Sequence, residues 1–253
     1  MDSTFIFNES HTQLVFCSDN DWYITENGED KVKLFDSSYS IEILVPNHTA
    51  MKRSSYYSSI RIYAIPTFAD QFYIDYEEEA LCYINKKWEM KEVCIIDECK
   101  ISKDGSKIYF LDGDSLYQID SSKLDNIVFI ADNVEEFVIL SNGKAIYYMD
   151  DEDTLWYKKG TKDAKRIADD VYNLVLTSDD FALFLTEYYY GSGILYASTN
   201  GGEKQRVHDD VYSILTSNTA TYYYANYDSD DSTKDLYGTT DKLNFHLIVE
   251  DIQ

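Results

Sequence analysis

The chain of 253 residues carries 46 acidic and 22 basic side chains, a net charge of −24, and is 44% hydrophobic and 15% aromatic. The hydrophobic content indicates a globular protein with a buried core, and the negative charge argues against binding to nucleic acids or anionic membranes. No apolar run approaches the roughly 18 residues of a membrane span, so we expect no insertion into a membrane.

The composition also favours strands over helices. The chain holds 24 tyrosines but only 10 glycines and 2 prolines. Tyrosine suits half-buried strands, because its ring packs against a sheet while its hydroxyl reaches water. The turns must then rely mainly on aspartate, asparagine and serine.

Short β-type runs start near the amino terminus. Gln13–Asp19 followed by Trp22–Ile24, and Gln71–Asp75 followed by Leu81–Tyr83, each read as two neighbouring strands. The stretch 37–58 between them is irregular. Insertions of this kind are where binding loops tend to lie, but a degenerate part of a repeat explains the stretch equally well.

From residue 98 onward the pattern repeats clearly. Gly105–Asp112 followed by Leu116-Tyr117 aligns with Gly143–Asp150 followed by Leu155-Trp156. The leucine-aromatic pair recurs downstream, at steps of 39, 40 and 41 residues from one pair to the next. A second marker, an acid or asparagine followed by valine or isoleucine, recurs at Asn133-Val134, Asp170-Val171, Asp210-Val211 and Asp251-Ile252.

Each repeat contains four short β-type runs, which are named strands A to D. In the repeat 134–170 they are Phe137–Leu140, Ala145–Met149, Leu155–Tyr157 and Lys165–Ala168. Four strands in about 40 residues match one blade of a β-propeller. We therefore predict an all-β protein, a β-propeller of six four-stranded blades in a single domain spanning 1–253. The predicted units are 4–58 including the irregular stretch, 59–97, 98–133, 134–170, 171–210 and 211–252.

The segment Lys107–Asp120, which reads KIYFLDGDSLYQID, resembles the repeat of TolB-like and low-density-lipoprotein-receptor-like β-propeller proteins, especially their uncharacterised bacterial branch. The resemblance is clear over residues 98–252 and implies the architecture, not an activity. The YWTD tetrad of the receptor-like members is absent. Ser198–Gly202 also resembles the Asp-box turn of sialidase-type propellers, again a structural motif.

Acidic residues follow strand B in every predicted unit, at Asp19, Asp75, Asp112, Asp150, Glu187 and Asp228. The junctions between strand D and the next strand A are acidic too. In a four-stranded antiparallel blade these two kinds of connection leave the sheet on the same face. We therefore expect a strongly negative face, with the lysine-rich C–D turns opposite.

The acids that follow strand B are the candidate residues for binding a partner or a cation: Asp112, Asp114, Asp150, Asp151, Asp153, Asp228, Asp230 and Asp231. Weak association of Ca²⁺ is one expectation, although these clusters lack the spacing and glycine of an EF-hand loop. The alternative is that aspartate is simply a good turn residue.

We expect a non-enzymatic binding or scaffold module that presents its acidic face to a protein, peptide or cation. The alternative is a carbohydrate-active hydrolase with two carboxylates in the central funnel. We identify no catalytic residues, and the four histidines have no metal-ligand spacing. The tyrosine run 188–190 either stacks on a sugar or peptide or packs at the end of strands.

The four cysteines, Cys17, Cys82, Cys94 and Cys99, contain no CxxC pair, so we expect free buried thiols. If Trp88 marks a hairpin turn, Cys82 and Cys94 lie opposite each other and form the one plausible disulfide. The first residues lack a secretory signal, which predicts a cytoplasmic protein, with an ectodomain fragment of a bacterial membrane-anchored protein as the alternative.

Overall fold

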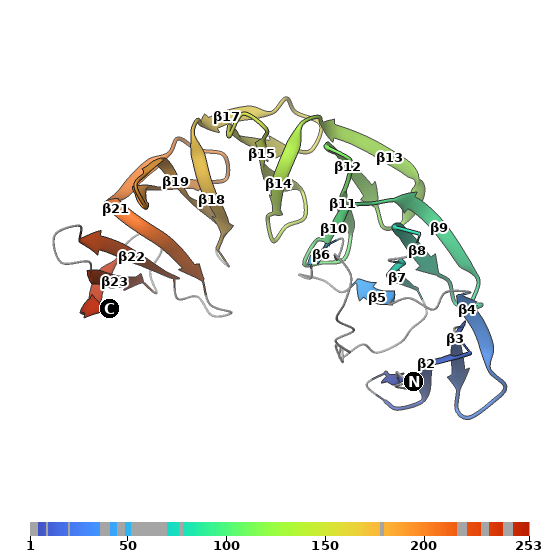
Figure 1. Cartoon of the computed structure of the whole chain (residues 1–253). Coiled ribbons are helices and arrows are strands. Elements are labelled where there is room, and N and C mark those ends of the chain that lie inside the picture. Colours follow the sequence, from blue (N-terminus) through green and yellow to red (C-terminus); the bar gives the residue numbers. More distant parts are fainter. Residues whose placement is uncertain are drawn as a thin grey trace. The chain divides into compact units, whose positions relative to one another are not determined.

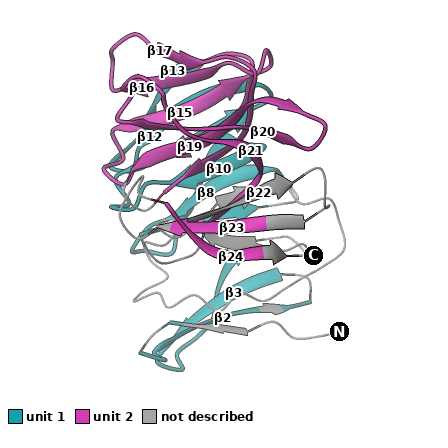
Figure 2. Cartoon of the chain, turned by 90° about the vertical axis from the view of Figure 1, so that its left-hand side faces the viewer, with its two compact units in different colours: residues 1–130 teal, residues 131–253 magenta. Residues whose placement is uncertain are grey.

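Strands and turns make up all of the described chain in the computed structural model, which confirms the all-β prediction. The structure describes residues 5–8, 10–19, 21–35, 41–44, 49–51, 70–75, 78–177, 180–216, 222–228, 233–239 and 245–252. These residues include no helix that is long and apolar enough to cross a membrane. The chain divides into two compact units, residues 1–130 and 131–253 (Figure 2).

Three antiparallel sheets form unit 1. The first contains β1 (Phe5–Phe7), β2 (Gln13–Ser18), β3 (Asp21–Glu26) and β4 (Val32–Phe35) in chain order. The second contains β5 (Ile41–Leu44), β7 (Gln71–Asp75), β8 (Ala80–Ile84) and β9 (Met90–Ile95). The third contains β6 (Thr49–Met51), β10 (Glu98–Ile101), β11 (Lys107–Asp112), β12 (Ser115–Asp120) and β13 (Lys123–Ala131).

The irregular stretch 37–58 departs from the unit boundaries expected from the sequence. Its strand β5 pairs with β7 of the second sheet, and its strand β6 pairs with β10 of the third. The stretch therefore supplies edge strands to two sheets that follow it in the chain, instead of completing the first. Short runs of three or four residues without a flanking turn motif give no such pairing information. The remainder of 37–58 lies outside the described residues.

Two sheets form unit 2 (Figure 1). One contains β14 (Val134–Ile139), β15 (Ala145–Asp150), β16 (Leu155–Lys159) and β17 (Lys165–Ala168). The other has seven strands in chain order: β18 (Val171–Leu176), β19 (Phe181–Tyr189), β20 (Ser192–Thr199), β21 (Gln205–Thr216), β22 (Tyr222–Asp228), β23 (Thr233–Thr239) and β24 (His246–Ile252).

Strand β21 joins the last two repeats into this seven-stranded sheet. Its first half pairs with β20, and its second half pairs with β22. Val211, in the middle of the strand, is paired with Gly193 on one side and Asn226 on the other. The strand D of one repeat thus runs directly into the strand A of the next.

Among the described residues, three hydrophobic clusters lie between neighbouring sheets of the same unit, and a fourth lies within the seven-stranded sheet. In unit 1, Trp22 of the first sheet packs in one cluster with Tyr73 and Cys82 of the second. In unit 2, Tyr147 and Leu155 pack in one cluster with Phe184 of β19. The second strand of each repeat is buried on both faces, which is why these strands read as continuous apolar runs.

The thiols of Cys82, Cys94 and Cys99 are free. Cys82 does not lie opposite Cys94 as proposed from the sequence, because it pairs with Glu92, while Cys94 pairs with Leu81. The two side chains belong to different core clusters. The turn is centred one residue before Trp88, and a bulge after Leu81 changes the register again.

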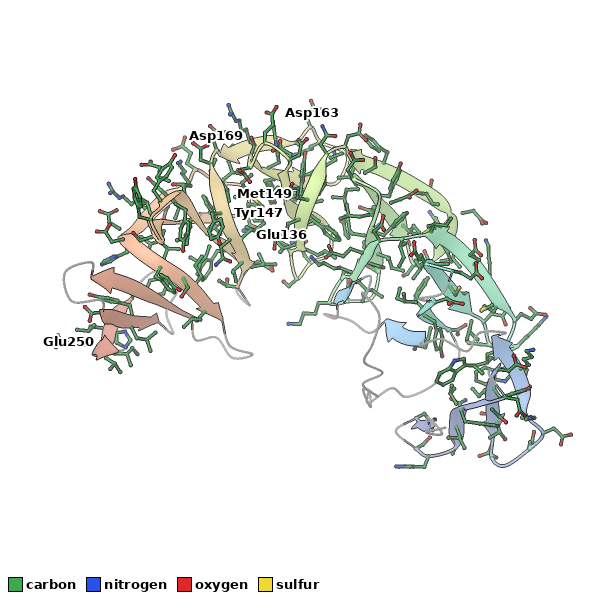
Figure 3. All side chains as sticks on the ribbon, viewed as in Figure 1. Glu136, Tyr147, Met149, Asp163, Asp169 and Glu250 are labelled. Carbon is green, nitrogen blue, oxygen red and sulfur yellow. The ribbon has the colours of Figure 1, made fainter. Side chains whose placement is uncertain are left out.

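A buried hydrogen-bond network connects the two sheets of unit 2. The Tyr147 hydroxyl donates to the Ser198 carbonyl at 3.0 Å and accepts from the Gly201 amide at 2.9 Å. Lys165 Nζ donates to the Gly201 carbonyl at 2.7 Å. The backbone of the β20–β21 turn is therefore held by side chains of the preceding sheet. Figure 3 shows Tyr147 and Met149 in the interior of that sheet.

Thr186 in β19 is 2% exposed, and its hydroxyl has no hydrogen-bond partner in the described part of the chain. Valine has the same shape and avoids the cost of burying an unpaired hydroxyl. We expect Thr186→Val to raise the free energy of unfolding by about 1 kcal/mol, measured by urea denaturation.

The control for this substitution is Thr177→Val. Thr177 is equally buried, but its hydroxyl donates to the Phe181 carbonyl at 3.0 Å. We expect this variant to lose about 1 kcal/mol of stability. Equal losses in both variants would mean that the Thr186 hydroxyl is paired.

Candidate functional site

The turns between strands B and C lie against the D–A junctions, as the sequence predicts for a four-stranded meander. In unit 2 the Asp151 amide donates to the Asn133 carbonyl at 2.9 Å, and the Val171 amide donates to the Asp153 carbonyl at 2.9 Å. The acidic turn 150–153 is thus hydrogen-bonded to both the junction before its sheet and the junction after it.

The same arrangement occurs in unit 1. The Ile96 amide donates to the Glu79 carbonyl at 2.7 Å, and the Gly113 amide donates to the Asp97 carboxylate at 2.8 Å. The Asp97 amide in turn donates to the Leu111 carbonyl at 2.8 Å. The margin of each sheet that carries its B–C turn and its D–A junctions is termed its acidic edge.

The periodic marker at the junctions has a conformational cause. Asn133, Asp170 and Asp210 have φ angles of 55°, 50° and 55°, in the left-handed region where asparagine and aspartate are tolerated best after glycine. The residue after each of them is a valine that is at most 3% exposed. The marker therefore combines a residue in the left-handed conformation with the first core residue of strand A.

Asp150 is held by its own turn. One carboxylate oxygen accepts hydrogen bonds from the amides of Glu152 at 3.2 Å and Thr154 at 2.8 Å. The other accepts from Trp156 Nε1 at 2.7 Å. Asp150 therefore shapes the β15–β16 turn, as expected if aspartate serves there as a turn residue. Its carboxylate has little capacity left for a ligand.

The other candidate acids fall into two groups. Asp112, Asp114, Asp151 and Asp153 are exposed at the acidic edges of the third and fourth sheets. Asp228 is the last residue of β22, but its side chain is outside the described part, as are Asp230 and Asp231 entirely.

No group of three or more histidine, cysteine or acidic side chains that could hold a metal ion occurs among the described residues. The exposed acids in this part of the chain are thus arranged along an edge and do not converge on one point. Such an arrangement suits an extended cationic surface better than a single coordinated ion.

Part of the negative charge is neutralised by a pair of arginines that repeat at a step of 40 residues. Arg166 forms an ion pair with Asp169, and Arg206 forms the equivalent pair with Asp209. Figure 3 shows Asp169 at the outer margin of its sheet. The next residue along the chain, Asp170 or Asp210, takes part in none of the described ion pairs.

Two tyrosines near this edge were missed by the sequence analysis. Tyr172 and Tyr212 each follow the acid-valine marker directly, and both are at least 40% exposed. The repeated sequence Asp-Val-Tyr was the available signal, because the marker predicts that valine faces the core and the next residue faces solvent.

A search of protein-family models finds no match to this chain, and a search of curated proteins finds none. Similar solved structures include a eukaryotic initiation factor, with 10% identity over 99% of this chain and a TM-score of 0.52. The match covers 66% of that protein, so the chain spans just under two thirds of its length.

Two further solved structures have lower scores. The β-propeller domain of the Trilobed protease from Pyrococcus furiosus has 9% identity and a TM-score of 0.46, covering 97% of this chain and 69% of that one. A nidogen/laminin complex has 10% identity and a TM-score of 0.40, covering 92% of each chain. The repeated antiparallel sheets belong to the all-β, β-propeller fold class that the sequence predicts. The count of six blades and their grouping in one domain stay predictions.

Proposed function

We propose that this protein is a non-enzymatic binding or scaffold module whose acidic edges engage a basic protein or peptide. The observation that carries the proposal is the hydrogen bonding between B–C turns and D–A junctions, which brings acids from separate parts of each repeat to one margin. Exposed like charges at one margin create a field that attracts a polycation and repels acidic partners.

The resemblance of Lys107–Asp120 to TolB-like and receptor-like propeller repeats belongs to this proposal as well. It supports an interaction role only in general terms, because propellers carry many unrelated functions. A divalent cation would be held diffusely by the exposed acids, since no described cluster converges on an ion.

The test measures binding of a fluorescent peptide of alternating arginine and glycine to the whole chain. We expect the variant carrying Asp→Asn at 112, 114, 151 and 153 to bind about ten-fold more weakly, because it lacks four charges of the acidic edges. Asparagine keeps the left-handed conformation of Asp153, so the turn is preserved.

The matched control removes four exposed acids from C–D turns by substituting Glu29→Gln, Asp30→Asn, Asp163→Asn and Glu203→Gln. Both variants have the same net charge, −24 plus 4, or −20. We expect the control to bind within about two-fold of the natural chain, because its charges lie away from the acidic edges. Equal weakening in the two variants would show that only net charge matters and would contradict the proposal.

A further inference from the structure

Tyrosines from three strands meet at the acidic edge of the seven-stranded sheet: Tyr172 of β18, Tyr188 of β19 and Tyr212 of β21. Tyr189 and Tyr190 follow Tyr188 directly, at the end of β19 and in the turn after it, and the five residues are termed the tyrosine cluster. The rings of Tyr172 and Tyr188 are stacked, with centroids 4.2 Å apart and planes at 16°. The Tyr188 hydroxyl donates to the Tyr212 carbonyl at 3.3 Å, so three strands are bound together at this point.

Most of the cluster is open to solvent. Tyr172 is 52% exposed, Tyr189 is 68% exposed and Tyr190 is completely exposed. Tyr188 is only partly buried and fixes the cluster to the core beneath the sheet. An exposed aromatic surface of this kind is typical of interaction sites, where tyrosine is enriched.

Tyr190 has a left-handed backbone conformation that is unfavourable for tyrosine, and the turn could be formed by another residue. Tyr190 and Gly191 have φ angles of 54° and 96° between the paired residues Tyr189 and Ser192, which defines a tight hairpin turn that favours Asn-Gly. Trp88 also has a positive φ, but it packs against the core. Tyr190 has no such packing, so stability does not explain a tyrosine at this position.

Exposed carboxylates border the cluster on the same sheet. Glu187 directly precedes Tyr188 and is exposed. Asp170 and Asp210 are exposed and directly precede Val171 and Val211, which pair with Thr186 and Gly193 at this end of the sheet. None of the three acids takes part in a described ion pair. Aromatic faces next to exposed carboxylates match a guanidinium or ammonium group in both charge and shape.

We propose that the tyrosine cluster is the docking site for an arginine- or lysine-containing peptide segment, held by cation–π contacts with the tyrosines and by Asp170, Glu187 and Asp210. This inference rests on the proposed function and deepens it by naming the site and the chemistry of the partner. The stacked pair of Tyr172 and Tyr188 supplies an aromatic face, and the fully exposed Tyr190 lies at the hairpin turn two residues after Tyr188. The alternative raised by the sequence, in which the tyrosines stack on a sugar, predicts no role for the acids.

The experiment uses the whole chain, the arginine-glycine peptide and a peptide in which citrulline replaces each arginine. We expect Tyr189→Ser combined with Tyr190→Asn to weaken binding of the arginine peptide by about five- to ten-fold. We expect the citrulline peptide to bind the natural chain at least as weakly as the arginine peptide binds this variant. Tyr190→Asn alone should raise the melting temperature while it weakens binding, which separates loss of the site from loss of the fold.

The matched control is Phe129→Asn on β13, which removes an aromatic ring that is 52% exposed and lies outside the cluster. It should leave binding unchanged. If the acidic-edge variant weakens binding but the tyrosine variant does not, the proposed function stands and this inference is wrong. If the natural chain binds no arginine peptide, both are wrong. If the tyrosine variant loses binding to chitohexaose but keeps arginine-peptide binding, the cluster is a sugar site and the inference is overturned.

Discussion

Replacing Gly201 with alanine is expected to destabilise the protein by about 3 to 5 kcal/mol, since two costs combine at this position. Its φ angle of 70° is unfavourable for any residue with a Cβ atom. A Cβ at this position would also overlap the ring of Tyr157, which is only 8% exposed and packs against Tyr147. The ring cannot move aside without disturbing the hydrogen bond between Tyr147 and the Gly201 amide.

The matched control is Gly160→Ala in the same unit. Gly160 has a φ angle of 56°, but a Cβ there would meet no atom within 4 Å. We expect this variant to lose only the conformational cost of about 1 to 2 kcal/mol. Urea denaturation of both variants gives the comparison. Similar losses at the two positions would mean that the β20–β21 turn shifts freely and that its contact with the preceding sheet is loose.

Alkaline unfolding is the second large effect that we expect. Burial raises the pKa of Tyr109 to about 12 and that of Cys82 also to about 12, with Asp75 adding to the effect at Cys82. Burial raises the pKa of Tyr73 well above its usual range. All three side chains are at most 3% exposed and lie in unit 1.

Below about pH 8 the three groups keep their protons in the folded and the unfolded chain alike, so the stability linked to them is fully present. Above pH 10 the unfolded chain releases these protons and the folded chain retains them. Stability then falls by about 1.4 kcal/mol per group per pH unit, or about 4 kcal/mol for the three groups together. A domain with a typical stability of about 5 to 15 kcal/mol should therefore unfold as the pH approaches 12.

Circular dichroism and tyrosinate absorbance, recorded together against pH, measure this transition. We expect Tyr109→Phe to reduce the slope of stability against pH above 10 by about 1.4 kcal/mol per pH unit, because one group with a raised pKa is removed. If the tyrosines titrate at their ordinary pKa while the circular dichroism stays unchanged, the rings are accessible and the explanation is wrong.

The sequence predicts the repeated strands well because their signals are local. Gly143–Asp150 and Leu155-Trp156 combine an apolar run with a turn on each side, and they form β15 and β16 as expected. The acids at the D–A junctions are also predictable, because a left-handed residue must precede each buried valine. Both features depend on neighbouring residues alone.

The features that the sequence does not reveal depend on long-range pairing. Strand β5 pairs with β7, from which residues 45–70 separate it in the chain, and no local motif specifies this pairing. Cys82 lies opposite Glu92 because the turn between β8 and β9 is centred one residue before Trp88, a shift that the alternation of side chains does not reveal. Asp150 looks like a ligand until its hydrogen bonds to Thr154 and Trp156 are known.

The continuous strand β21 also bears on how such a protein gains or loses repeats during evolution. Recombination at the junction before β14 or β18 separates complete sheets, because each junction ends one sheet and begins another. A break at residue 210 would instead cut through a strand that is paired on both sides of Val211. The region 171–252 is therefore expected to be inherited, duplicated or deleted as one double repeat.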